Sequence, residues 1–315
     1  MTIVTSDITD LVGNTPLFKL NHIVPEEAAE IYVKLESFNV GGSVKTRTAL
    51  NLILDAEKKN KLKPGDTIVE ATTGNTGVGL ALIGPARGYK VLIVMPDNVD
   101  SVRVEILKAY GAEIAFVDHE RGINGLFEVA ESYDQKEGFT FMRQFSNPAN
   151  PETHIKSTGP EIVDALGKSP DGFVAGVGTG GTLSGTAAYL KRFNPDMIVH
   201  AVEPAESAVL HGHEKGSHEI QGIGAGIIPD TLNTSIYDQV IDVTSQQAID
   251  MTRKLAREES IFAGISSGAN VFAAIEMAKQ LGKGKVVVTI APDTGERYMQ
   301  SNIFMDKNSY TPKRD

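Results

Sequence analysis

The chain of 315 residues contains no cysteine and no tryptophan. Without cysteine it forms no disulfide, binds no metal through a thiolate and has no cysteine nucleophile. Long apolar runs are missing as well, because no stretch approaches the roughly 18 residues that a membrane-spanning helix needs. The segment 1–7 also lacks the basic and apolar regions of a secretory signal peptide. These absences predict a soluble, cytoplasmic protein.

Basic residues are in deficit, since 30 lysines and arginines face 40 aspartates and glutamates and the net charge is −10. Nucleic acids and anionic membranes attract clustered cations, so this balance argues against both as partners. Hydrophobic residues at 41% and charged residues at 22% are typical of a globular chain rather than a disordered one. The length suits one large or two medium domains, at roughly 100–200 residues each.

Short β-branched runs alternate with longer segments of helical spacing. We expect strands at 67–71, 90–95, 113–116, 172–176, 198–202, 240–243 and 285–290. Strands that alternate with helices indicate an α/β protein whose mainly parallel, twisted sheets are flanked by helices on both faces. The segment 67–142 forms one such unit and the part from 172 onward a second, so two closely packed domains are expected.

Turns rich in glycine and hydroxyl groups occur at 71–77, 176–182, 222–226, 264–268 and 293–295. Glycine often does no more than end a strand. In an open α/β sheet, however, ligands bind beyond the carboxyl ends of the strands. Several such turns, all with serine, threonine or asparagine nearby, favour one polar cleft.

The turn 178–182 supports two interpretations. It follows an apolar run and opens a helix, and its glycines and free amides suit a phosphate group. It also matches the dinucleotide pattern Gly176-x-Gly178-x-x-Gly181, with Glu203 about 20 residues further on, where a ribose-binding acid is expected. On this loop alone, a nicotinamide-dependent oxidoreductase is favoured.

Lys45 lies in a Gly-Ser turn, 39–47, that runs into an amphipathic helix. The helix dipole repels a cation at its N-terminus, which lowers the pKa of the lysine and favours a neutral amine. Schiff-base chemistry needs a neutral amine. Most lysines of this chain must lie on the surface, so an ordinary surface lysine is the alternative.

Several short motifs follow one another along the chain. They lie at 13–17, in the Lys45 turn, and at 73–77, 144–151, 176–182, 221–229, 264–269 and 295–298. Over nearly its whole length the chain resembles the cysteine synthase (O-acetylserine sulfhydrylase) family of pyridoxal-phosphate enzymes. That family has the tryptophan synthase β-like fold, also called fold type II. The resemblance makes the oxidoreductase the lesser alternative.

The resemblance implies roles for individual residues. Lys45 would be the catalytic residue and would form a Schiff base with pyridoxal 5′-phosphate. Asn75 would donate to the ring hydroxyl of the cofactor, and Thr294 would face its pyridine nitrogen. The cofactor phosphate would be held by Gly178, Thr179, Gly180, Gly181 and Thr182. The substrate carboxylate would be held by Thr72, Thr73, Thr76 and Gln144.

The implied reaction is a β-replacement that makes L-cysteine from O-acetyl-L-serine and sulfide through an aminoacrylate intermediate. The resemblance also implies a larger cofactor-binding domain, 1–45 with 148–315, and a smaller, mobile substrate-binding domain, 46–147. A homodimer is expected, and a serine acetyltransferase is a candidate partner. No metal is expected, because His211, His213 and His218 lack a zinc-like framework.

Several positions depart from the family pattern. Thr73 and Thr294 stand where serine is usual, Ile227 replaces a habitual phenylalanine, and the segment 95–103, with Val102, lacks the usual Met-Ser-x-Glu-Arg. These departures leave open a cysteine desulfhydrase that releases hydrogen sulfide, a cystathionine β-synthase or an enzyme that uses O-phosphoserine. No arginine lies in 222–226 to bind a phosphorylated serine, so the acetyl ester is the expected donor.

Overall fold

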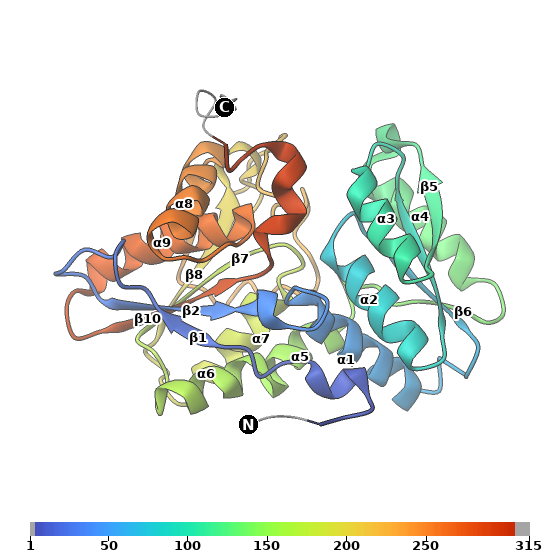
Figure 1. The fold of residues 1–315 in the computed structure, drawn as a ribbon, viewed down its shortest axis with the longest axis horizontal. Coiled ribbons are helices and arrows are strands. Elements are labelled where there is room, and N and C mark those ends of the chain that lie inside the picture. Colours follow the sequence, from blue (N-terminus) through green and yellow to red (C-terminus); the bar gives the residue numbers. More distant parts are fainter. Residues whose placement is uncertain (1–3, 306–315) are drawn as a thin grey trace, which may run out of the picture.

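A computed structural model describes residues 4–305 of the chain. Two sheets organise it (Figure 1). The larger sheet has the strand order β1 (Leu17–Lys19), β2 (Glu30–Leu35), β10 (Val286–Ala291), β7 (Gly172–Gly176), β8 (Ile198–Pro204) and β9 (Gln239–Val243). The smaller sheet has the order β5 (Glu113–Val117), β4 (Lys90–Pro96), β3 (Thr67–Ala71) and β6 (Phe139–Phe141). Only the pair β1–β2 is antiparallel among these strands.

Helices cover both sheets. Beside the larger sheet lie α5 (Ala149–Lys156), α6 (Thr158–Leu166), α7 (Gly181–Leu190), α8 (Ser245–Glu258) and α9 (Ile265–Leu281). In Figure 1, α8 and α9 lie on one face of this sheet and α5, α6 and α7 on the other. Beside the smaller sheet lie α2 (Asn75–Ala86), α3 (Ser101–Ala109) and α4 (Gly122–Asp134). The predicted α/β class with helices on both faces is confirmed.

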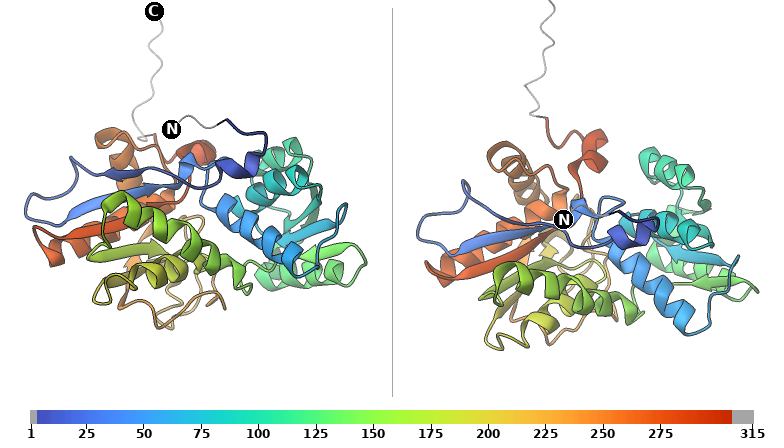
Figure 2. Two further views of the ribbon diagram at one scale, coloured as in Figure 1. Left: turned by 90° about the horizontal axis from the view of Figure 1, so that it is seen from below. Right: turned by 60° about the horizontal axis from the view of Figure 1, so that its bottom comes forward.

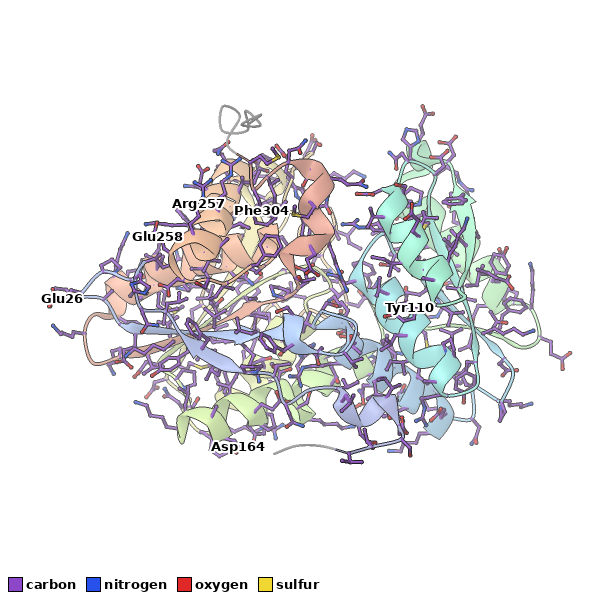
Figure 3. The ribbon with its side chains drawn as sticks, viewed as in Figure 1. Glu26, Tyr110, Asp164, Arg257, Glu258 and Phe304 are labelled. Carbon is purple, nitrogen blue, oxygen red and sulfur yellow. The ribbon has the colours of Figure 1, made fainter. Side chains whose placement is uncertain are left out.

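The central strands are apolar because both of their faces are covered. All six residues of β10 are buried, as a parallel strand between two helical layers requires. Charged side chains such as Glu26, Asp164 and Glu258 lie on the outside instead (Figure 3). Among the described residues, none of the helices combines the length and the apolar character needed to cross a membrane.

Helix α1 (Lys45–Lys58) joins the two halves of the molecule, since it packs against α2 and α5 (Figure 2). Gly79 of α2 permits this close approach, because a Cβ there would lie 2.9 Å from the carbonyl oxygen of Lys45. The larger sheet takes its strands from 17–35 and 172–291, and the smaller sheet from 67–141. The domain boundaries at 45/46 and 147/148, and the mobility of the smaller domain, stay predictions.

Candidate active site

A cleft of about 490 Å³ lies at the carboxyl ends of strands from both sheets. The loops after β3 and β7 contribute to its walls, as do the first turn of α9 and the segment 221–225. Each glycine-rich turn named above except 293–295 therefore reaches this cleft. Within residues 4–305, no aspartate or glutamate lines it, although the chain carries a net charge of −10.

Lys45 is the first residue of α1, and its half-buried side chain lines the cleft. Desolvation lowers its pKa from 10.5 to about 8, and the charge of Asp293 partly opposes this. No described residue accepts a hydrogen bond from its amine. The sequence predicted that the helix dipole lowers the pKa of Lys45, whereas in the structure the largest cause is desolvation by burial. About one tenth of the amine is therefore neutral at pH 7, far more than for a lysine with the ordinary pKa of 10.5.

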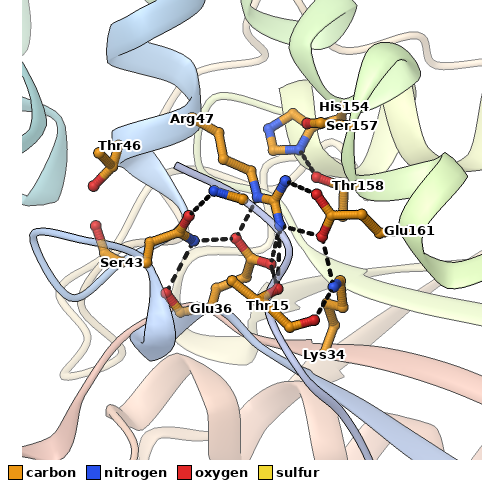
Figure 4. Close-up of polar contacts among 12 residues, drawn as sticks. Thr15, Lys34, Glu36, Ser43, Thr46, Arg47, His154, Ser157, Thr158 and Glu161 are labelled. Carbon is orange, nitrogen blue, oxygen red and sulfur yellow. Dashed lines mark hydrogen bonds and ion pairs between the residues drawn. The ribbon is translucent and has the colours of Figure 1, made fainter. Parts of the chain in front are cut away.

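A buried ion network fixes the start of α1 (Figure 4). Arg47 donates to Glu36 Oε2 over 2.7 Å and to both oxygens of Glu161 over 2.6 Å. Lys34 of β2 reaches Glu161 Oε2 at 2.7 Å. Burial works to raise the pKa of Glu161, but the bonds and charges of Arg47 and Lys34 lower it to about 2. The network thus ties α1 to the larger sheet and to α6, directly beside Lys45.

The loop 72–76 leads into α2, whose N-terminus has no side-chain cap. Its free amides and positive dipole end suit a carboxylate. Thr76 donates to Gln144 Oε1 over 2.6 Å, and Gln144 Nε2 donates to the carbonyl of Ala71 over 3.2 Å. Thr72, Thr73, Thr76 and Gln144 all line the cleft, so the structure brings the predicted substrate residues together.

Glu70 is buried next to the loop 72–76 and bonds the backbone beside it. The sequence had not singled out this residue. Its carboxyl oxygens accept from the backbone amides of Ala71, over 2.9 Å, and Gln144, over 3.1 Å. Burial raises the pKa of Glu70 to about 8, although these two bonds oppose the shift. Glu70 thus fixes the backbone on both sides of the substrate loop.

Helix α7 also has an N-terminus without a side-chain cap, where Gly180 has φ +80°. A Cβ on Gly178 would lie 2.3 Å from the carbonyl oxygen of Gly222, and one on Gly181 would lie 2.1 Å from Asn150 Oδ1. Only glycine fits this close packing. Gly178, Thr179, Gly180 and Thr182 line the cleft, while Gly181 begins the helix. The side chains of Asn150 and His154 orient the hydroxyls of Thr179 and Thr182 at 2.8 and 3.2 Å.

The predicted role of Thr294 at the pyridine nitrogen stays a prediction. Thr294 is not among the described residues that line the cleft, and its side chain accepts from the backbone amide of Glu296 as the N-cap of η5 (Gly295–Ser301). Ser266, buried in the first turn of α9, does line the cleft. The sequence analysis named the turn 264–268, which contains Ser266, and the turn 293–295, which contains Thr294. Both turns carry hydroxyl groups, and the sequence alone does not show which of them reaches the cleft.

Glu203 does not lie on the cleft among the described residues, which removes the ribose-binding acid of the oxidoreductase interpretation. Its carboxylate accepts from the amides of Leu210 and His211 over 2.8 and 3.1 Å. His211 Nδ1 lies 3.0 Å from Glu203 and 2.9 Å from Asp242. Glu203, His211 and Asp242 thus contact one another, and His213 and His218 take no part in this group.

Three further cleft residues were not expected. Arg103 of α3 donates to the carbonyl of Thr73 over 2.9 Å and to the side chain of Gln221, so it spans the cleft. Asn98 and His119 extend the wall on the same side. These residues follow β4 and β5 in segments without a glycine-rich motif, and the sequence therefore gave no signal for them.

Comparison with known proteins agrees with this geometry. The family described as "Pyridoxal-phosphate dependent enzyme" matches residues 8–293. A cysteine synthase of Staphylococcus aureus (strain N315) is 50% identical over 299 residues, which cover 95% of this chain and 96% of the relative. The chain belongs to the pyridoxal-phosphate-dependent cysteine synthase family.

Other members of the family are similar to it in sequence and structure. Cysteine synthase A of Escherichia coli (strain K12) is 45% identical over 306 residues, which cover 94% of each chain. The crystal structure of O-ureido-L-serine synthase superposes with a TM-score of 0.94 at 41% identity and 98% coverage of both chains. The predicted family, fold type and cofactor are confirmed.

The site fits pyridoxal 5′-phosphate, the cofactor of this family. An amine with a lowered pKa is available for a Schiff base at Lys45. At α7, tight glycine packing and uncapped amides form a cradle for a phosphate. A wall without carboxylates among the described residues suits this anionic group.

Proposed function

We propose that the protein makes L-cysteine from O-acetyl-L-serine and sulfide by β-replacement. The observation that carries the proposal is the meeting of three features in one cleft: the amine of Lys45, the hydroxyl-rich start of α2 and the glycine cradle of α7. When bound, pyridoxal 5′-phosphate supplies an electron sink for the electrons of the Cα–H bond. The remaining tasks belong to side chains and backbone amides of this chain.

Lys45 takes the proton from Cα of the substrate. With its pKa at about 8, the amine is basic enough to accept this proton and is partly neutral at physiological pH. The Cβ–O bond then breaks, and its electron pair leaves on the acetate oxygen. Sulfide adds to Cβ, and Lys45 returns the proton to Cα.

Thr72, Thr73, Thr76 and Gln144 hold the carboxylate of the substrate at the N-terminus of α2. The bond between Thr76 and Gln144, at 2.6 Å, fixes both side chains before the substrate arrives. Such preorganisation aligns the Cα–H bond with the amine and removes part of the entropic cost of the reaction.

The loop 178–182 holds the cofactor phosphate, and Asn75 donates to the ring hydroxyl. We propose that Ser266, rather than Thr294, faces the pyridine nitrogen, because Ser266 is the one of the two that lines the cleft. A neutral hydroxyl does not keep that nitrogen protonated as a carboxylate would.

The charges of the cleft favour anionic substrates. Lys45 and Arg103 line it without a carboxylate among the described lining residues, so hydrosulfide and the substrate carboxylate are attracted. Because 222–226 contains no arginine, the acetyl ester is the proposed donor.

We further propose a cytoplasmic homodimer that can bind a serine acetyltransferase. The homodimer and the serine acetyltransferase rest on the family resemblance alone, and the cytoplasmic location rests on the composition of the chain. Sedimentation of the purified protein, alone and mixed with a serine acetyltransferase, tests the second and third.

Cysteine formation by the purified holoenzyme tests the main proposal. The enzyme is mixed with sulfide and, in separate reactions, O-acetylserine, O-phosphoserine or serine, and cysteine is quantified. O-acetylserine should react fastest, and Lys45→Ala should abolish the product. Faster turnover of another donor would overturn the donor assignment. Rapid release of hydrogen sulfide from cysteine without net synthesis would overturn the direction.

A further inference from the structure

Both ends of the Asn75 amide are hydrogen-bonded to residues from the half of the molecule that contains the larger sheet. Its Nδ2 donates to Asp293 Oδ2 over 2.6 Å, and its Oδ1 accepts a hydrogen bond from Nη1 of Arg297. Asn75 begins α2 beside the smaller sheet, whereas Asp293 and Arg297 follow β10 of the larger sheet. The contact therefore joins the two halves of the molecule at the site.

These partners determine which way the amide faces. Arginine only donates hydrogen bonds, so Oδ1 of Asn75 must face Arg297 and Nδ2 must face Asp293. A flipped amide would place N–H groups against the guanidinium and a carbonyl oxygen against the carboxyl group. An amide nitrogen carries two N–H groups, so one donor remains after Asp293 has accepted the first. Asn75 lines the cleft, and no other described residue accepts a hydrogen bond from its Nδ2.

Asp293 and Arg297 are themselves held in place. The Asp293 side chain is 1% exposed, and the hydroxyl of Tyr298 donates to the same Oδ2 over 2.6 Å. Oδ1 of Asp293 is buried and has no hydrogen-bond partner among the described residues, so the ordering of this group depends on Oδ2. Arg297 also donates to the carbonyl of Gly41, in the turn that precedes Lys45. Neither residue can swing away without breaking a second bond.

We propose that Asp293 and Arg297 are positioning residues, which lock the amide of Asn75 so that its second N–H meets the ring oxygen of the cofactor. The inference rests on the proposed function, because the role of Asn75 at the cofactor is itself part of that proposal. What it adds is that two residues on the other half of the molecule determine the orientation of the Asn75 side chain.

A double-mutant cycle separates positioning from simple bracing of the fold. Asp293→Ala and Arg297→Gln are made alone and in combination with Asn75→Ala. The readouts are the dissociation constant of pyridoxal 5′-phosphate for the apoprotein and the visible absorption spectrum of the loaded protein. Arg253→Gln is the matched control, because Arg253 bonds the carbonyl of Ile303, just beyond η5, and does not touch Asn75.

We expect Asp293→Ala and Arg297→Gln each to weaken cofactor binding about fivefold, the effect of one lost hydrogen bond. Both should change the absorption bands in the direction that Asn75→Ala does. In the Asn75→Ala background they should add nothing, and Asp293→Asn, which keeps an acceptor oxygen, should restore both readouts. Arg253→Gln should leave both unchanged.

The inference would be overturned if the losses of cofactor affinity in the double variants equalled the sum of the losses in the single variants. It would also be overturned if Asp293→Ala and Arg297→Gln alone kept the wild-type spectrum and affinity. If Asp293→Ala does not fold, the Arg297→Gln cycle decides. An Asn75→Ala protein with wild-type affinity and spectrum would also overturn it. A wild-type protein that binds the cofactor normally but forms no cysteine would overturn the proposed function alone.

Discussion

Lys34 and Lys45 are two desolvated lysines on neighbouring elements, and they differ in their partners. Lys34 is 1% exposed and donates to Glu161, at 2.7 Å, and to the carbonyl of Thr15. Burial lowers its pKa, and the charge of Glu161 opposes the shift. Lys45 has the cleft on one side and no hydrogen-bond acceptor among the described residues, so its pKa falls to about 8.

Desolvation alone therefore does not make a lysine reactive. A carboxylate in contact keeps the ammonium charged and turns the lysine into a structural tie. Where carboxylates are kept off the wall, the same desolvation lowers the pKa of the amine to about 8 and makes the neutral form accessible. The four predictions that follow test this difference, in order of decreasing effect.

Lys45→Ala should lower the rate of cysteine formation by about 10³-fold or more, because both the base and the nucleophile are lost. The free energy of unfolding should stay within about 1 kcal/mol of the wild type, because no described residue would lose a hydrogen bond when the amine of Lys45 is removed. Steady-state rates and urea unfolding measure the two quantities. A mutant that keeps near-normal turnover would remove Lys45 from the mechanism.

Glu161→Gln should destabilise the protein by about 3 kcal/mol, because Lys34 and Arg47 lose their shared carboxylate. The pKa of Glu161 in the fold, about 2, lies below its ordinary value of 4.5. Its contribution is therefore present above pH 4.5 and is lost as the pH falls toward 2. Urea unfolding of both proteins across this interval checks the sign: the wild type should lose stability more steeply than the variant.

Reconstitution of the apoprotein with pyridoxal 5′-phosphate should speed up as the pH rises and level off above about 8, the pKa of Lys45. Below this pH the amine is protonated and cannot attack an aldehyde. Each unit further below should slow the reaction by about tenfold. Stopped-flow absorbance gives the rates. A rate that still rises toward pH 10 would mean that Lys45 resembles an ordinary exposed lysine.

Lys34→Met should cost about 2 kcal/mol of unfolding free energy, less than Glu161→Gln, because Arg47 still neutralises Glu161. The rate of cysteine formation should change by less than about twofold. This variant is the counterpart of Lys45→Ala, since it affects stability and leaves the chemistry intact. A large loss of turnover would show that the ion network governs the reactivity of Lys45.

The sequence predicted the strands that obey simple patterns and missed three others. β3 and β7 begin and end at the predicted residues. β1 and β6 have three residues each, too few to establish a period of two. β2 was hidden by Lys34, a buried charge in an otherwise apolar run, whose burial depends on a carboxylate from distant α6.

The predicted site residues were recognised through contiguous motifs, and the structure gathers nearly all of them at one cleft. The role of Thr294 at the pyridine nitrogen stays a prediction, and the structure places Ser266 rather than Thr294 on the cleft wall. Both residues stand in glycine turns after apolar segments, and the pattern does not say which hydroxyl faces inward. Glu70 and Arg103 lie outside the glycine-rich motifs, and Asp293 stands in the turn 293–295 without having been singled out. Their roles come from contacts with residues far away in the chain.

The sequence by itself determined the alternation of strands and helices, the turns at the strand ends and the family, because these depend on local spacing and order. Only the tertiary structure decided which lysine has its pKa lowered to about 8, which hydroxyl lines the cleft and what fixes Asn75. Those properties depend on desolvation and on partners that lie apart in the chain. Both arise only when the two sheets come together.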